Sequence, residues 1–60
     1  MIQHLPNDPV MLMSFVNTKL RDVCTDLDDF CATYGVDRRW LESKLHEAGF
    51  EYNKEQNKFW

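Results

Sequence analysis

The chain has 60 residues, of which 43% are apolar and 28% charged, and its net charge is −3. This balance is that of a globular domain rather than a disordered segment, and no apolar run approaches the ~18 residues of a membrane-spanning helix. The length allows one small domain of marginal stability, and the N-terminus lacks the basic and apolar regions of an export signal, so we expect a cytoplasmic protein without membrane contact.

A first helix is predicted over about residues 9–23. Asp8 is expected to cap its free amides, and Pro9 suits the first helical position because it has no amide to leave unsatisfied. The residues that mark its apolar face at helical spacing are Leu12, Val16, Leu20 and Val23.

The first half of this helix is apolar on nearly all sides, since only Ser14 is polar between Val10 and Val16. A domain of this size has little material to cover such a segment, which predicts an association surface for a second copy of the chain or a small protein partner. In the alternative, Ile2 and Leu5 fold back over the segment and no partner is needed. The candidate surface residues are Met11, Met13, Phe15 and Trp40.

A second helix is predicted over about residues 26–34, with Thr25 as its cap and Gly35 at its left-handed end. Aspartates fill its first turn, where the helix dipole favours negative charge. Its apolar face consists of Leu27, Phe30, Cys31 and Tyr34.

A third helix is predicted over about residues 38–48, capped by Asp37 and ended by Gly49. The segment over about residues 50–60 is expected to form a short hairpin, with a positive φ at Asn57. The expected fold is therefore mainly α, a three-helix bundle with a C-terminal β-hairpin.

The second and third helices are spaced like a helix-turn-helix, in which Cys31 is the small residue that allows close approach. Such a module followed by a wing suggests DNA binding as the alternative function, with Arg38, Arg39 and Ser43 as candidate contacts. The charge argues against nucleic acid, because the acidic chain lacks the basic stripe that binds phosphates.

The sequence offers no catalytic constellation and no phosphate-binding loop, so we expect no enzymatic activity and no cofactor. Cys24 and Cys31 are expected to be buried thiols rather than a disulfide framework. Together with His4 and His46 they lack the spacing of metal ligands, and no metal is expected.

The strings LPNDPVML at 5–12 and SFVNTKLRD at 14–22, with Leu27 and Cys31, resemble family 4250 of domains of unknown function. The closing residues 49–52 with Asn57 and Phe59 extend this resemblance over almost the whole chain. The family implies a small stand-alone bacterial protein with no assigned activity.

The resemblance directs attention to the polar residues Asn17, Arg21 and Asp22. Asn17 and Arg21 lie four positions apart and share a helix face. The Arg21 guanidinium is expected to bond Asp22, an acidic residue of the second helix or the chain end. We expect it to anchor one element against another, with ligand binding as the alternative, and Arg21→Ala to lower the melting temperature by several degrees.

Overall fold

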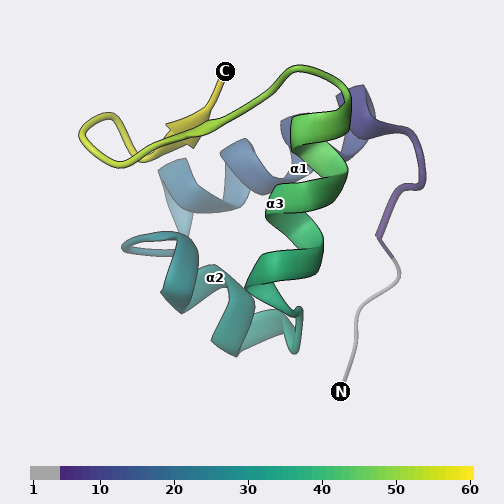
Figure 1. The fold of residues 1–60 in the computed structure, drawn as a ribbon. Helices are drawn as coiled ribbons and strands as arrows, with labels where there is room; N and C mark the ends of the chain where they lie inside the picture. The colour runs from purple at the N-terminus through teal and green to yellow at the C-terminus, as the bar shows by residue number, and fades with distance from the viewer. Residues whose placement is uncertain (1–4) are drawn as a thin grey trace.

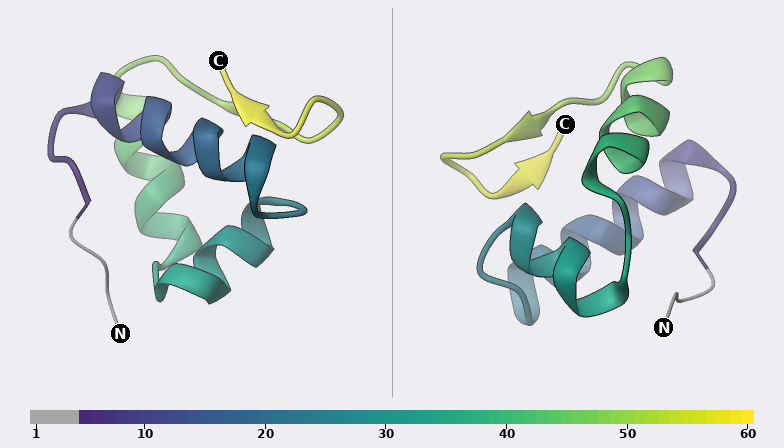
Figure 2. Two further views of the ribbon diagram at one scale, coloured as in Figure 1. Left: turned by 180° about the vertical axis from the view of Figure 1, so that it is seen from behind. Right: turned by 60° about the horizontal axis from the view of Figure 1, so that its bottom comes forward.

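Three helices and a hairpin make up the computed structural model, which describes residues 5–60 (Figure 1). In Figure 1 and in the left view of Figure 2, α1 and α3 cross each other, while α2 lies on one side of α1 and the hairpin on the other. The predicted mainly α fold with a C-terminal hairpin is confirmed. The elements are α1 (Pro9–Asp22), α2 (Leu27–Tyr34), α3 (Arg38–Glu47), β1 (Tyr52–Asn53) and β2 (Lys58–Phe59).

The core consists of apolar side chains from all three helices, from the connection between α1 and α2 and from β2, each at most 8% exposed. Val23, predicted on the apolar face of the first helix, is instead 65% exposed, because α1 ends at Asp22 and Val23 leaves helical geometry. Leu5 packs against the core, whereas Ile2 lies outside the described residues. The core residues are Leu12, Val16, Leu20, Cys24, Leu27, Phe30, Cys31, Leu41, Leu45 and Phe59.

Aspartate side chains cap the N-termini of α1 and α3 as the sequence predicts. Asp8 accepts a hydrogen bond from the Met11 amide at 3.2 Å, with Pro9 at the first helical position. Asp37 accepts from the Arg39 amide at 2.9 Å. Each carboxylate therefore satisfies an amide that has no partner within its helix.

The predicted cap of α2 is wrong by one residue. Asp26, not Thr25, is the cap, and it accepts from the Asp29 amide at 2.8 Å. The Asp29 carboxylate in turn accepts from the Thr25 amide at 3.0 Å. This reciprocal pair satisfies two amides, which a Thr25 hydroxyl one position earlier does not.

Glycines follow the last turns of α2 and α3, as predicted. Gly35 has φ 67°, and the following Val36 amide donates to the Cys31 carbonyl at 2.9 Å. Gly49 has φ 90°, and the Phe50 amide donates to the Leu45 carbonyl at 2.9 Å. Left-handed backbone at these positions favours glycine because it has no Cβ.

The two strands are antiparallel, with Tyr52 opposite Phe59 and Asn53 opposite Lys58. The Asn53 side chain closes the connecting loop by accepting from the Gln56 amide at 2.9 Å. On the helical side, residues 35–37 join α2 to α3, and their likeness to a helix-turn-helix stays a prediction.

Candidate functional site

The carboxamide of Asn17 docks β2 on α1. Its Nδ2 donates to the Phe59 carbonyl at 3.0 Å, and its Oδ1 accepts from the Phe59 amide at 2.7 Å. On the neighbouring pair, Glu51 and Trp60 exchange both backbone hydrogen bonds. Because bonded and non-bonded pairs alternate along an antiparallel ladder, the backbone of Phe59 points away from β1. Asn17 therefore pairs with the outer edge of β2 as a neighbouring strand would.

Asn57 forms a second link between the hairpin and α1. Its Nδ2 donates to the Leu20 carbonyl at 3.1 Å, and its Oδ1 accepts from the Tyr52 hydroxyl at 2.7 Å. The Leu20 carbonyl lies in the last turn of α1, where the Cys24 amide donates instead to the Lys19 carbonyl. The predicted positive φ of Asn57 is confirmed at 55°. This one residue thus shapes the loop and satisfies a helix-end carbonyl.

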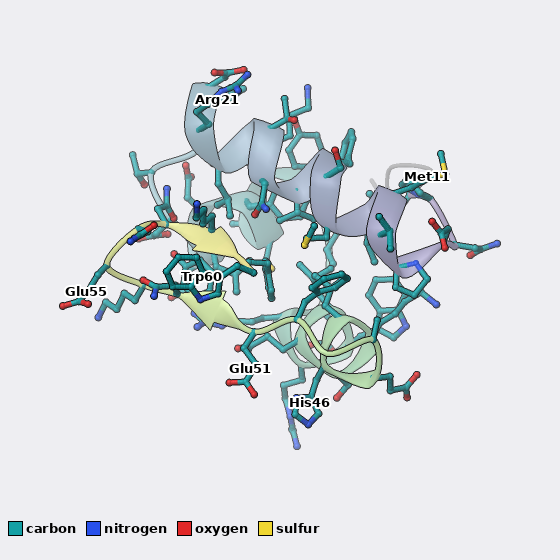
Figure 3. All side chains as sticks on the ribbon, turned by 90° about the horizontal axis from the view of Figure 1, so that it is seen from above. Met11, Arg21, His46, Glu51, Glu55 and Trp60 are labelled. Atoms are coloured by element: carbon teal, nitrogen blue, oxygen red, sulfur yellow. The ribbon has the colours of Figure 1, made fainter. Side chains whose placement is uncertain are left out.

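Arg21 does not anchor one element against another. Its guanidinium bonds the adjacent Asp22 at 2.9 and 3.0 Å, and its side chain is 75% exposed (Figure 3). Hydrogen bonding within this pair lowers the pKa of Asp22 and raises that of Arg21. Both residues belong to α1, so of the three predicted anchor residues only Asn17 reaches another element.

The candidate association residues of α1 lie on different sides of the helix. Met11 and Met13 are two positions apart, which places them on nearly opposite sides. Met11 is 61% exposed and lies at the rim of the molecule in Figure 3, whereas Met13 packs partly against the core. Phe15 is half-buried, edge-on to Phe30 and Tyr34 with ring centres 6.3 and 6.1 Å away. The predicted set is therefore not one patch, and Met11 lies on the Phe15 side.

The first candidate nucleic-acid contact, Arg38, is held by two carboxylates. Its Nη1 donates to Asp28 Oδ1 at 2.6 Å and its Nε to Glu42 Oε1 at 3.1 Å. These hydrogen bonds, first that of Asp28, raise the pKa of Arg38. The guanidinium also lies 5.7 Å from the Tyr52 ring centre. Arg38 thus links α2, α3 and β1, and its charge is compensated within the domain.

Arg39 and Ser43, the other two candidates, line an open groove between α3 and the hairpin. Its walls carry both signs of charge, from Arg39 on one hand and from Glu42 and Glu51 on the other. His46 Nδ1 lies 3.6 Å from Glu51 Oε2, and both side chains are exposed (Figure 3). Acidic side chains beside Arg39 oppose the binding of phosphate. The lining residues are Arg39, Glu42, Ser43, His46, Phe50, Glu51, Tyr52 and Phe59.

The comparison with family models decides the relationship of the chain. The model described as "Domain of unknown function (DUF4250)" matches residues 6–59. The chain belongs to the DUF4250 family. Searches of the curated proteins and of the solved structures each gave no match. The matched span of this DUF4250 domain includes every helix and strand, and both asparagines that dock the hairpin.

Two tryptophans of the DUF4250 domain are solvent-exposed, each beside a lysine. Trp40 in the first turn of α3 is 46% exposed, and Lys44 Nζ lies 6.0 Å from its ring centre. Trp60 is 55% exposed, with Lys58 Nζ 5.1 Å from its ring centre. Trp60 was not among the predicted surface residues, although strand alternation next to the buried Phe59 indicates an outward side chain.

The cysteines of this DUF4250 domain are buried free thiols, as predicted. Burial raises the pKa of both Cys24 and Cys31, which disfavours the nucleophilic thiolate. Over residues 5–60, no three His, Cys, Asp or Glu side chains gather as they would around a metal ion, and His4 lies outside that range. No helix in the same range has the length and apolar character to cross a bilayer.

Proposed function

We propose that this DUF4250 domain is a protein-association module that binds a second copy of itself through α1. The supporting observation is the exposure of Met11, 61% of whose surface is open to solvent beside the half-buried Phe15. Phe15 lies edge-on to the half-buried Tyr34 with ring centres 6.1 Å apart, so partly exposed aromatic side chains of α1 and α2 adjoin, above the fully buried Phe30. Exposed methionines beside aromatic rings are typical of association surfaces because the flexible thioether adapts to a partner.

The test is the molar mass of the domain in solution, measured by sedimentation equilibrium over a wide range of concentration. The proposal expects a monomer–dimer equilibrium that Met11→Glu abolishes. Burying a carboxylate in the interface would remove its hydration, and this free-energy cost opposes dimerisation. Val10→Glu is the matched control, since Val10 is also exposed in the first turn of α1 but points to another side. A monomer at every concentration contradicts the proposal.

The same protein is then titrated into a labelled random-sequence DNA duplex at low and moderate salt. A dimer that does not bind the duplex at either salt concentration supports association as the function. Binding that weakens steeply with salt is the signature of phosphate contacts. Salt-dependent binding that Arg39→Ala removes would assign the domain to nucleic acid instead.

A further inference from the structure

Four side chains form a stripe along α1 that carries opposite charges at its two ends. The stripe consists of Asp8, Met11, Phe15 and Lys19, at steps of 3, 4 and 4 residues. At 100° per residue Met11, Phe15 and Lys19 stay within about 80° of one another around the helix axis. Asp8 is the extended cap that precedes the helix, and its carboxylate lies beside Met11 because it accepts the Met11 amide. Asp8 and Met11 are exposed, and Phe15 and Lys19 are half-buried, with Lys19 Nζ 5.5 Å from the Phe15 ring centre.

The geometry points to an antiparallel pairing of this stripe with the same stripe of a second copy, about a two-fold axis between Met11 and Phe15. Met11 of each copy then packs on Phe15 of the other, and Asp8 lies beside Lys19. The inference rests on the proposed function, which it specifies as a pairing of α1 with α1.

The spacing of the stripe fits this symmetry. The midpoint between positions 11 and 15 is 13, and that between 8 and 19 is 13.5. The two midpoints differ by half a residue, which is about 0.8 Å along a helix. A single two-fold axis can therefore relate both the Met11–Phe15 contacts and the Asp8–Lys19 contacts. A two-fold interface repeats each contact, which gives two methionine–aromatic contacts and two ion pairs.

The charges also select the antiparallel direction. In a parallel pairing at equal height, Asp8 would face Asp8 and Lys19 would face Lys19, and like charges at close range are unfavourable. The antiparallel arrangement replaces both repulsions with attractions. It also brings each lysine near the acidic cap of the other helix, where Asp8 already holds the Met11 amide.

Charge variants test the register by the dimer dissociation constant from sedimentation equilibrium. Lys19→Glu places a carboxylate opposite Asp8 of the second copy and is expected to raise the dissociation constant by at least about tenfold. Adding Asp8→Asn to that variant should restore part of the lost affinity, because it removes the new repulsion but not the missing attraction, while asparagine caps a helix as well as aspartate. Lys54→Glu, the same charge change in the exposed hairpin loop, is the control and leaves the constant unchanged.

The outcomes separate the two proposals. The register is wrong, while association stands, if the unmodified protein dimerises but Lys19→Glu and Lys54→Glu raise the dimer dissociation constant equally. The same holds if Asp8→Asn restores none of the affinity that Lys19→Glu removes. If the unmodified protein stays monomeric, association itself fails. Thermal melts of every variant show whether each is folded, so that a lost dimer is not mistaken for a lost fold.

Discussion

Asn17 and Phe59 lie 42 positions apart in sequence, and each donates one hydrogen bond to the other and accepts one. The pairing joins the first helix to the last strand. A two-residue ribbon is too short to persist alone in water, so β2 depends on α1 for its place.

Replacing Asn17 by alanine should therefore destabilise the domain. The change removes both hydrogen bonds and leaves the half-buried backbone groups of Phe59 without a partner. This is expected to lower the free energy of unfolding by about 1–3 kcal/mol. For a domain of this size, each kcal/mol of lost stability lowers the melting temperature by about 4–8 °C. Thermal unfolding followed by circular dichroism measures this shift. Thr18→Ala is the control, because the Thr18 hydroxyl bonds only the Ser14 carbonyl within α1. Equal melting temperatures for the two variants would contradict the docking role.

Two variants of Asn57 separate its backbone role from its side-chain role. Asn57→Gly keeps the positive φ but removes the bonds with Leu20 and Tyr52, whereas Asn57→Ala also strains the backbone. Left-handed backbone costs a residue with a Cβ about 1–2 kcal/mol, so alanine should be the more destabilising by about that amount. Urea unfolding gives the free energy of unfolding of both variants. A glycine variant as stable as the original protein would show that the side-chain hydrogen bonds contribute nothing to stability.

Arg21→Ala should leave the melting temperature at pH 7 close to that of the unmodified protein. This reverses the expectation from sequence, because among residues 5–60 the guanidinium pairs only with Asp22, and its side chain is largely exposed to water. Since Arg21 lowers the pKa of Asp22, any stabilisation exists above the ordinary carboxyl pKa and disappears as the pH falls through the lowered value. Melts at pH 7 and in acid measure this directly, and a loss as large as that of Asn17→Ala would restore the anchor role.

The two thiols should make the domain less stable in alkaline solution. Burial raises their pKa in the folded state, so their stabilising contribution is complete below the ordinary thiol pKa and is lost as the pH rises through the raised value. The urea midpoint should fall from neutral to alkaline pH, and less so in Cys24→Ala/Cys31→Ala. In the native protein both thiols should react slowly with a disulfide reagent and quickly once unfolded. An identical pH dependence in the double variant would assign the effect to other groups.

The helix ends could be read from sequence because their signals are local. Asp8 with Pro9, Asp37 and the two glycines each act on backbone groups within a few residues, and the structure has all of them in these roles. Thr25 was mistaken for a cap because Asp26 next to it has the same chemistry. Only the geometry of the Asp29 amide distinguishes the two residues.

The docking of the hairpin was not predictable in the same way. The amide of Asn17 is one polar group on a helix surface, and no neighbour in sequence indicates that its partner is Phe59. The division of the methionine surface, by contrast, follows from helical spacing alone, since positions two apart never share a side. The charged ends of the α1 stripe are visible in the sequence as well, once Asp8 and Lys19 are assigned to one side.

By occupying the outer edge of β2, Asn17 takes up the two backbone groups with which another strand would pair there. An open strand edge is a template on which further chains add, and a ribbon with two such edges grows in both directions. With its β2 side covered by Asn17, the ribbon offers one edge fewer to another strand. Removal of this one carboxamide would therefore leave the β2 edge open to a further chain, in addition to lowering the melting temperature.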